Sequence, residues 1–209
     1  LNGGNAMRAI VDEFERRGLP VFGPRKAAAE LEGSKIFAKE FMGRHGIPTA
    51  EFTLARDRAE AERAVRALGL PVVLKADGLA AGKGVIIAAS VDEANAAVRD
   101  MLAGNAFGEA GHRVVVEEFL QGEEASFIVM ADGTHVLALA TSQDHKRVGD
   151  GDTGPNTGGM GAYSPAPVVT PEIHARVMRE VIEPTVRGMQ AEGHPYTGFL
   201  YAGLMIDAH

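Results

Sequence analysis

The chain has 209 residues with 45% hydrophobic residues, no cysteine and a formal net charge of −7 at pH 7, so it suits one large domain or two small lobes. The absence of cysteine excludes disulfides and thiolate metal sites, and favours the reducing cytoplasm as location. No apolar run approaches the roughly 18 residues of a membrane span, and an acidic chain with few aromatic residues is not expected to bind nucleic acid.

Leu1 to Met7 are polar and Gly-rich without an apolar period, and are interpreted as a remnant or a frayed end. Apolar residues from Ile10 to Phe14 follow helical spacing, and Leu19 to Pro24 favour a short strand. This helix and strand are typical of the end of an open α/β unit. Residues 1–50 are therefore assigned to the remnant of an N-terminal α/β domain and a connecting helix.

Ala27 to His45 are predicted to be helical, with a break at Glu32 to Lys35 where Ser34 can cap the second helix. Lys35 then lies in the first helical turn, where the helix dipole disfavours a cation. Two interpretations stay open for Lys35: an exposed surface residue, or a residue that binds an anion at the helix start.

Residues 51–120 are predicted to form a small α/β lobe of alternating strands and helices. Its helices are expected from a cap at Asp57 to Leu68, and from a cap at Ser90 to Leu102. Its strands are expected at Ala50 to Leu54, Val72 to Lys75, Val85 to Ala89 and Arg113 to Phe119.

A Gly-rich loop, Gly78 to Gly84, joins the two middle strands of this lobe. Glycines let backbone N–H groups approach a polyphosphate, and Lys75 and Lys83 supply positive charge. The loop is not a Walker A motif, because Gly84 stands where Ser or Thr would hold Mg²⁺ and a strand follows instead of a helix. The alternative is an ordinary hairpin with solvated lysines. We expect the loop to be mobile without nucleotide.

Residues 121–209 are predicted to form a second, incomplete lobe. The acidic run Glu117 to Glu124 leads into it, as either a cleft edge or a solvated turn. Strands are expected at Ala125 to Ala131, at His135 to Ser142 after an Asp132-Gly133 turn, and at Gly198 to Ile206; a helix kinked at Pro184 is expected from Pro171 to Gln190.

Gln143 to Tyr163 show no periodicity and are predicted to be one long functional loop. Its cationic residues Lys146 and Arg147, beside Gly, Asn and Thr, suit an anionic substrate near reacting phosphates. His145 alone is more often a structural or surface residue than a catalyst.

Four stretches together resemble the ATP-grasp fold and, within it, the phosphoribosylamine–glycine ligase (glycinamide ribonucleotide synthetase) family. The resemblance covers about residues 18–207, and its most specific parts are Leu74 to Gly84, Glu117 to Ser126, Gln143 to Arg147 and Gly154 to Tyr163. It implies an α/β (α+β) chain with two lobes and nucleotide between them, truncated at the C-terminus.

By resemblance, the reaction is an ATP-dependent carboxylate–amine ligation in purine biosynthesis. The carboxylate of glycine attacks the γ-phosphate, and 5-phosphoribosylamine takes the glycyl group to give glycinamide ribonucleotide, ADP and phosphate. Both steps gather negative charge, so fixed cations and N–H donors are required. The alternatives are a non-catalytic ATP-binding module, or another ATP-grasp carboxylate–amine ligase, against which Gln143 to Tyr163 argue. No oligomeric state is implied.

The resemblance also implies roles for single residues. Lys35 and Lys75 are expected to contact the phosphates, and the loop is expected to cover the triphosphate with Asp77, Gly78, Gly82, Lys83 and Gly84. Adenine is expected to be bound by Glu117, Glu118, Phe119 and Leu120, and the ribose by Glu124. The expected catalytic residues are Lys75 with Asp144, Lys146, Arg147 and Asn156, the last four facing glycine and the sugar phosphate.

Magnesium or manganese is the metal that the resemblance implies, held by a Glu and an Asn on a strand beyond the C-terminus of this chain. Asp207 is not expected to be a metal ligand. The chain by itself is therefore expected to lack ligase activity while still binding nucleotide weakly.

Overall fold

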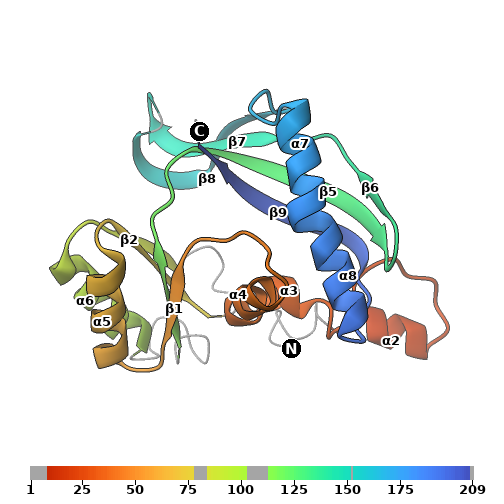
Figure 1. The fold of residues 1–209 in the computed structure, drawn as a ribbon, viewed down its shortest axis with the longest axis horizontal. Coiled ribbons are helices and arrows are strands. Elements are labelled where there is room, and N and C mark those ends of the chain that lie inside the picture. The colour runs from red at the N-terminus through yellow and green to blue at the C-terminus, as the bar shows by residue number, and fades with distance from the viewer. Residues whose placement is uncertain (1–8, 78–83, 103–112, 152, 208–209) are drawn as a thin grey trace. The chain divides into compact units, whose positions relative to one another are not determined.

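The computed structural model describes residues 9–77, 84–102, 113–151 and 153–207 of the chain (Figure 1). The segment predicted to be a frayed end, Leu1 to Met7, lies outside the described residues.

The structure divides into two compact units, each with its own sheet. The first unit comprises the described part of Leu1–Arg17 together with Lys26–Leu120. The second comprises Gly18–Arg25 and the described part of Gln121–His209. The three-part domain assignment made from the sequence stays a proposal.

The first unit is built on a four-stranded antiparallel sheet in the order β1-β4-β2-β3. Its strands are β1 (Phe52–Ala55), β2 (Val72–Ala76), β3 (Val85–Ala88) and β4 (Val114–Glu118). Its helices are α2 (Ile10–Arg16), α3 (Glu30–Gly33), α4 (Lys35–Arg44), α5 (Arg58–Leu68) and α6 (Val91–Leu102). The strands and helices predicted for residues 51–120 are confirmed, with ends shifted by one or two residues.

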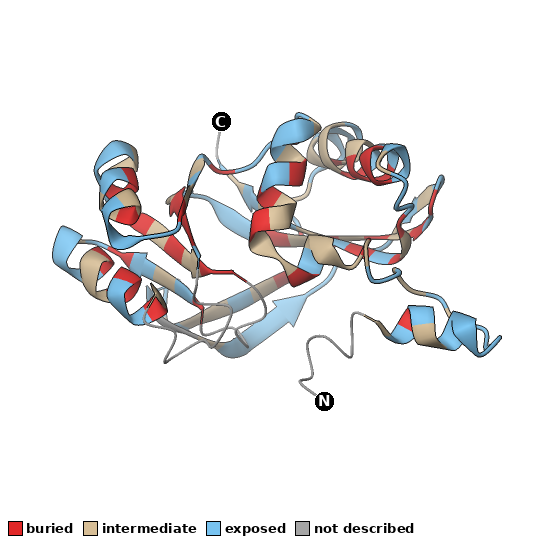
Figure 2. Cartoon of the chain, turned by 90° about the horizontal axis from the view of Figure 1, so that it is seen from below, coloured by how far each residue is buried: buried red, intermediate tan, exposed pale blue. Residues whose placement is uncertain are grey.

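Helices α5 and α6 cover one face of this sheet and bury a core of Ala, Val, Leu and Met side chains (Figure 2). Each helix starts at a side-chain cap, since Asp57 accepts from the N–H of Glu60 at 2.8 Å and Ser90 accepts from the N–H of Glu93 at 3.2 Å. Leu74 and Val116 point into the core from neighbouring strands and are fully buried. Because side chains alternate along a strand, the residues between them lie on the opposite face.

The second unit holds a three-stranded antiparallel sheet in the order β6-β5-β9 and a separate ribbon, β7-β8. Its strands are β5 (Glu123–Asp132), β6 (Val136–Ala138), β7 (Gln143–Gly149), β8 (Thr153–Tyr163) and β9 (Thr197–Ile206). One long helical rod lies along the β5-β9 sheet (Figure 1) and consists of α7 (Pro171–Val177), a π-helical segment (Met178–Ile182) and α8 (Glu183–Ala191).

The π-helical segment ends two residues before Pro184, which stands at the start of α8. Proline has no N–H and its ring crowds the carbonyl of the preceding turn. A wider turn at this point removes the conflict without ending the helix. The helix predicted from Pro171 to Gln190 is therefore confirmed, with its disturbance spread over the residues that precede Pro184.

The prediction of one long structureless loop from Gln143 to Tyr163 is wrong. Strands β7 and β8 pair antiparallel through this segment, with Gln143 opposite Tyr163 and Arg147 opposite Asn156, and with two irregularities in register. Glycines and bulges hide the alternation that marks a strand in a sequence, which is why the pattern showed no period.

The short strand predicted for Leu19 to Pro24 is also wrong, because these residues form no strand. The segment instead packs Phe22 edge-on against Phe199, with ring centroids 5.6 Å apart. Gly198, at φ +132°, permits this approach, since an added Cβ would lie 2.9 Å from Cδ of Pro24. Side-chain packing therefore holds the segment against β9.

Asp132 supports the turn between β5 and β6 by accepting from the backbone N–H groups of Thr134 at 2.9 Å and His135 at 2.7 Å. The bond from His135, followed by that from Thr134, lowers the pKa of Asp132 from 3.8 to about 2. A depressed folded-state pKa means that this stabilisation is present above the unfolded pKa and lost as pH falls toward about 2.

An NMR titration of the Asp132 carboxyl carbon is expected to give a midpoint near 2 in the folded chain. The same titration in concentrated urea should return the midpoint to about 3.9. Equal midpoints in the folded and unfolded chains would contradict the hydrogen bonding described for this turn.

Across the described ranges, none of the helices has the length and apolarity needed to traverse a bilayer.

Candidate functional site

The first unit carries a cluster of charged side chains on the sheet face opposite the α5-α6 core. Lys75 on β2 and Glu117 on β4 come from adjacent antiparallel strands, and Glu117 lies opposite Val73 in the register. This diagonal relationship places both side chains on one face within reach of each other. Nζ of Lys75 donates to Oε2 of Glu117 at 2.7 Å.

Glu117 is almost fully buried, at 4% exposure, and its two oxygens differ in their contacts. No group among the described residues donates a hydrogen bond to Oε1, although this atom is buried. Nζ of Lys39 lies 3.4 Å from Oε1, which makes an ion pair without hydrogen-bond geometry. Oε1 is therefore a buried acceptor with capacity for a donor that the chain does not supply here.

Lys39 reaches Glu117 from α4 and is itself 6% exposed. Its ammonium donates to Oγ1 of Thr49 at 2.7 Å and to the carbonyl oxygen of Ala50 at 3.3 Å. Burial lowers the pKa of Lys39, while the Glu117 carboxylate opposes that effect. The contact with Glu117 shows that α4 lies over the charged face of the sheet.

Asp77 follows β2 directly and ties the start of α4 to it. Oδ1 of Asp77 accepts from Oγ of Ser34 at 3.0 Å and from the N–H of Ile36 at 3.3 Å, and Oδ2 accepts from Arg113 at 2.8 Å. Ser34 is the N-cap of α4 and accepts from the N–H of Phe37, which confirms the predicted cap. The Asp77 carboxylate thus occupies a position where a helix N-terminus favours negative charge.

Lys35 is the first residue of α4 and is half-buried. Burial lowers the pKa of Lys35, the nearby Asp77 carboxylate opposes this, and Lys75 adds to the lowering. We define the charge cluster by these mutually close groups: Lys35, Lys39, Lys75, Arg113, Asp77 and Glu117. Its four cations can bind an anionic ligand, and the carboxylates of Glu32 and Glu118 also act on Lys35 and Lys39 from its edge.

The Gly-rich loop begins beside this cluster, but its residues Gly78, Gly82 and Lys83 lie outside the described residues. The predicted mobility of the loop concerns these residues and stays a prediction. Gly84 is described, and its carbonyl accepts from the N–H of Ala76 at 2.8 Å. This bond closes the stem of the β2-β3 hairpin next to Asp77.

The residues predicted to contact adenine through their backbone follow Glu117 along the chain. Glu118 is engaged twice with Glu51, since its N–H donates to the Glu51 carbonyl at 3.0 Å and its Oε1 accepts from the Glu51 N–H at 2.8 Å. Phe119 is half-buried and Leu120 is 41% exposed. Backbone groups from Phe119 onward remain the better candidates for a ligand.

In the second unit, β5 and β7 bring Glu124 and Lys146 into an ion pair at 2.5 Å. Burial lowers the pKa of Lys146, but the hydrogen bond and charge of Glu124 outweigh it and the net pKa is raised. Beside this pair, Gln143 donates to Glu123 at 3.1 Å and accepts from the hydroxyl of Tyr163 at 2.8 Å. These bonds hold the β7-β8 ribbon to the start of β5.

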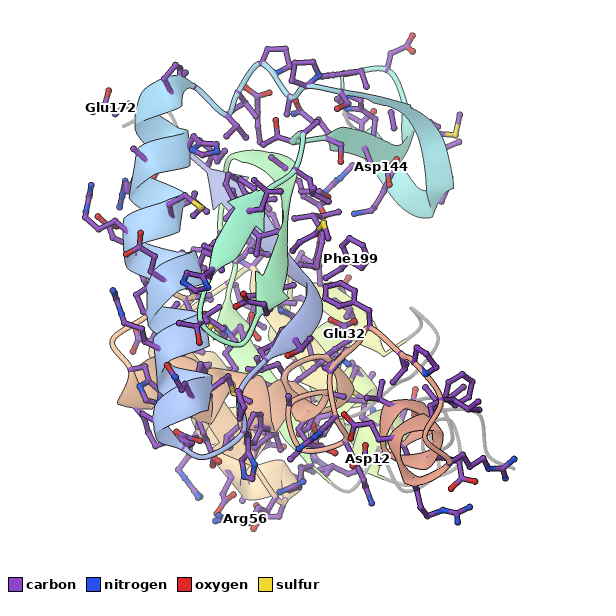
Figure 3. The ribbon with its side chains drawn as sticks, turned by 90° about the vertical axis from the view of Figure 1, so that its right-hand side faces the viewer. Asp12, Glu32, Arg56, Asp144, Glu172 and Phe199 are labelled. Atoms are coloured by element: carbon purple, nitrogen blue, oxygen red, sulfur yellow. The ribbon has the colours of Figure 1, made fainter. Side chains whose placement is uncertain are left out.

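The remaining predicted residues lie on the same ribbon. Asp144 is half-buried on β7, where Figure 3 shows it on the ribbon. Arg147 is half-buried opposite Asn156, whose side chain lies outside the described residues. His145 is exposed and packs its ring 5.3 Å from that of Tyr163.

The structure brings Lys35, Lys75, Asp77 and Glu117 together in one unit and Glu124 with Lys146 in the other. Sequence reasoning missed Lys39 and Arg113. Lys39 stands four residues after Lys35 and so on the same helix face, between the buried Ile36 and Phe41. A lysine on an otherwise apolar helix face is the sequence feature that could have identified Lys39.

A metal ion would need several oxygen or nitrogen ligands in one place. Within the described ranges, no group of three or more His, Cys, Asp or Glu side chains is placed to hold one. Magnesium is often bound through one or two carboxylates together with phosphate oxygens of a ligand, so the metal implied by the resemblance stays a prediction and no step is derived through it.

Known proteins identify the fold. The crystal structure of phosphoribosylamine–glycine ligase from Thermotoga maritima superposes with a TM-score of 0.83 and 40% identity, covering 95% of this chain and 50% of that one. The biotin carboxylase domain of Hydrogenobacter thermophilus 2-oxoglutarate carboxylase, solved with MgADP, gives a TM-score of 0.70 at 24% identity over 92% of this chain and 41% of that one. The second likeness concerns the fold alone.

Residues 33–209 match a family of ATP-grasp domains, so the chain is an ATP-grasp protein. It belongs to the family described as phosphoribosylglycinamide synthetase, ATP-grasp (A) domain. The phosphoribosylamine–glycine ligase of Xanthomonas campestris pv. campestris is 72% identical over 200 residues, which is 96% of this chain and 46% of the relative. The chain thus spans about half the length of the curated relatives that it matches.

Proposed function

We propose that the chain binds ATP and supplies the nucleotide-binding part of a phosphoribosylamine–glycine ligase. The observation that carries the proposal is the charge cluster, in which a buried carboxylate with one open acceptor lies beside several cations. The cations can pair with the negative charges of a triphosphate, and the carboxylate can accept a hydrogen bond from the amino group of adenine. Family membership supports the same assignment.

Lys35 and Lys75 are proposed to contact the α- and β-phosphates. Lys75 donates one of its three N–H groups to Glu117 and is partly exposed, so its other two N–H groups are available to a ligand. A hydrogen bond to a charged partner contributes about 1.5–3 kcal/mol. Two such lysines supply a large part of the affinity for ATP.

Asp77 is proposed to act through other residues and not by touching the phosphates. Asp77 is 8% exposed, and its carboxylate already accepts from Ser34, Ile36 and Arg113. By fixing the start of α4, it sets the position of Lys35. The Gly-rich loop is still proposed to cover the triphosphate, through Gly78, Gly82, Lys83 and Gly84.

Glu117 is proposed to recognise adenine. Its Oε1 accepts no hydrogen bond from the described residues, and because this atom is buried, the exocyclic amino group of the base can reach it only after the side chains around it move. An ionised carboxylate has no N–H or O–H to offer a carbonyl. Backbone groups of Phe119 and Leu120 are proposed to complete the base contact, next to Glu118, whose N–H already donates to the Glu51 carbonyl. This arrangement favours ATP over nucleotides that carry a carbonyl at the same ring position.

In the second unit, Glu124 is proposed to bind the ribose hydroxyls. Its present partner is Lys146, at the surface of the unit. Asp144, Lys146, Arg147 and Asn156 are proposed to face glycine and 5-phosphoribosylamine. Cations there offset the charge that gathers when a carboxylate attacks a phosphate and when an acyl phosphate reacts with the amine.

Isothermal titration of the 209-residue chain with ATP tests the nucleotide part of the proposal. We expect saturable binding of ATP that competes with ADP. Absence of binding by the folded chain would contradict the proposal, and binding without any ligase activity in the chimera described next would favour a non-catalytic ATP-binding module.

A chimera tests the ligase activity. The chain replaces the matching 200 residues of the Xanthomonas campestris relative, and phosphate release is measured with ATP, glycine and 5-phosphoribosylamine. We expect a rate comparable to that of the parent enzyme, dependent on both glycine and the amine. Release that depends on another acid instead of glycine would indicate a different carboxylate–amine ligase.

A further inference from the structure

The hydroxyl of Tyr201 distinguishes this residue from the other two tyrosines of the chain. The Tyr163 hydroxyl donates to Gln143 at 2.8 Å, and the Tyr196 hydroxyl donates to the Phe199 carbonyl at 2.9 Å. Among the residues that the structure describes, none forms a hydrogen bond with the Tyr201 hydroxyl. Because Tyr201 is also 49% exposed, it can offer this group to a ligand.

Tyr201 lies on the face of the β5-β9 sheet that points away from the helical rod. Side chains alternate along β9, and its exposed positions are Phe199, Tyr201, Gly203 and Met205. Figure 3 shows Phe199 on the side of the sheet away from α7 and α8, with Asp144 of the β7-β8 ribbon on the same side. Tyr201 therefore shares this side with a residue proposed to face the substrates.

Gly203 lets the Tyr201 hydroxyl extend toward the ion pair of Glu124 and Lys146. A Cβ added at Gly203 would lie 3.0 Å from Oη and 3.4 Å from Cε1 of Tyr201, so the ring lies along the strand over Gly203. Gly203 stands opposite Ser126 on β5, and Glu124 is two positions from Ser126 on the same face. Diagonal neighbours of this kind are about 7–8 Å apart, which long side chains can span.

Charge also links Tyr201 to Lys146. Burial lowers the pKa of Lys146, the Glu124 carboxylate raises it, and Tyr201 and Asp144 raise it further. Groups that act on one ammonium in this way lie close to it, because the interaction falls with distance. A phenol, an ammonium and two carboxylates are thus gathered at one place in the second unit.

These charges suit a zwitterion better than a phosphate dianion. Glu124 and Asp144 bring two negative charges to the single positive charge of Lys146, so the group repels a ligand that is only negative. An amino acid offers a carboxylate to the ammonium and the phenol, and an ammonium to the carboxylates. Glycine, the acid of the proposed reaction, is such a ligand.

We propose that Tyr201 is a substrate-binding residue whose hydroxyl donates to the carboxylate of glycine beside Lys146. This inference rests on the proposed function, in which Lys146 faces glycine. The ammonium of a lysine is a compact point charge and fixes no orientation by itself. A second donor, the phenol, fixes the direction of the carboxylate, which its attack on a phosphate requires.

NMR of the 209-residue chain, with carbon-13 at Cζ of its three tyrosines, tests the contact directly. Tyr201→Phe identifies the Tyr201 resonance by its loss. Glycine should shift this resonance saturably and the other two less, because the hydroxyls of Tyr163 and Tyr196 already donate within the chain. Methylamine, which lacks the carboxylate, should leave it in place. A shift by inorganic phosphate as large as that by glycine would overturn the assignment to a carboxylate.

Kinetics of the chimera with the Xanthomonas campestris relative test the same contact during the reaction. Tyr201→Phe should lower kcat/KM for glycine by about 10-fold to 100-fold, the range of a hydrogen bond to a charged group, and leave KM for ATP unchanged. Gly203→Ala should act in the same direction by a smaller factor, because its Cβ crowds the hydroxyl at 3.0 Å. Added to Tyr201→Phe, it should cause no further loss.

Tyr196→Phe is the matched control. It removes the same atom from the same unit, at a residue that is 6% exposed and donates to a backbone carbonyl. A loss of stability is expected there, without a change of kcat/KM for glycine in the folded protein. Thermal unfolding of each variant reports the stability separately.

The two experiments separate this inference from the proposed function. An active chimera that keeps its kcat/KM for glycine in Tyr201→Phe would overturn the inference and leave the ligase function standing. A chimera without glycine-dependent phosphate release would overturn the ligase function, and the NMR titration then decides on Tyr201 alone. A saturable shift with glycine supports the contact, and a resonance that does not move overturns it.

Discussion

Replacing Lys75 by methionine is expected to weaken ATP binding by about 10-fold to 100-fold. The ammonium of Lys75 is fixed by its 2.7 Å bond to Glu117 and is still partly exposed. A hydrogen bond to a charged group is worth about 1.5–3 kcal/mol, and each 1.4 kcal/mol is a factor of ten in affinity. Isothermal titration of the wild-type and variant chains with ATP measures the loss.

Arg66→Met is the control, because it removes the same charge from the same unit. Arg66 lies in the last turn of α5, with a side chain 69% exposed and only a 3.5 Å contact to Glu62. An exposed pair of this kind contributes little, so ATP affinity should change by less than about twofold. Equal losses in the two variants would mean that Lys75 acts through net charge and not through a phosphate contact.

The elements that the sequence predicted well are those whose side chains alternate between a core and an exposed face. Helices α5 and α6 have capping residues at Asp57 and Ser90 and a buried stripe on one side, so their limits follow from local chemistry. Strand β4 is a valine run buried in the sheet. In such segments local propensity and tertiary packing favour the same structure.

The β7-β8 ribbon shows where this reasoning ends. Its residues Val148, Met160 and Tyr163 are exposed, so no regular apolar face marks its strands in the sequence. Glycines and register irregularities remove the period of two. Only the pairing between β7 and β8 defines such a ribbon, and this pairing cannot be read from the sequence of either strand alone.

The residues of the candidate site likewise fall into those that could be predicted from the sequence and those that could not. Lys35, Lys75, Glu117 and Glu124 were named from motifs that carry the family resemblance. The structure pairs Lys75 with Glu117 and Glu124 with Lys146, and it places Lys35 where the charges of Asp77 and Lys75 act on it. Lys39 and Arg113 were missed because their partners are 78 and 36 positions away in the sequence, at Glu117 and Asp77. Contacts over such separations depend on the sheet order β1-β4-β2-β3, which no local pattern reveals.

Replacing Asp77 by alanine is expected to lower the free energy of unfolding of the first unit by about 2–4 kcal/mol. The carboxylate accepts from the Ser34 hydroxyl and from the buried N–H of Ile36, both at the start of α4. Leaving the buried N–H of Ile36 unsatisfied costs about 1–3 kcal/mol, and the lost hydrogen bond from the Ser34 hydroxyl costs a further 0.5–1.5 kcal/mol or so. Urea unfolding, followed by circular dichroism, measures the change.

Asp77→Asn separates the two halves of this effect. The amide oxygen can take the place of Oδ1 toward Ser34 and Ile36, so that only the Arg113 contact at Oδ2 is lost. The Arg113 side chain is 53% exposed, and a pair this open to solvent is worth about 1 kcal/mol or less. The asparagine variant should therefore retain most of the stability that the alanine variant loses.

The comparison with another cap identifies what Asp77 does beyond capping. Asp57→Ala removes an exposed cap of α5 that accepts a single N–H, from Glu60 at 2.8 Å, and should cost about 0.5–2 kcal/mol. Asp77→Ala should exceed it and should also weaken ATP binding, because Lys35 is the first residue of the helix that Asp77 fixes. Equal destabilisation of the two variants with unchanged ATP affinity would reduce Asp77 to an ordinary helix cap.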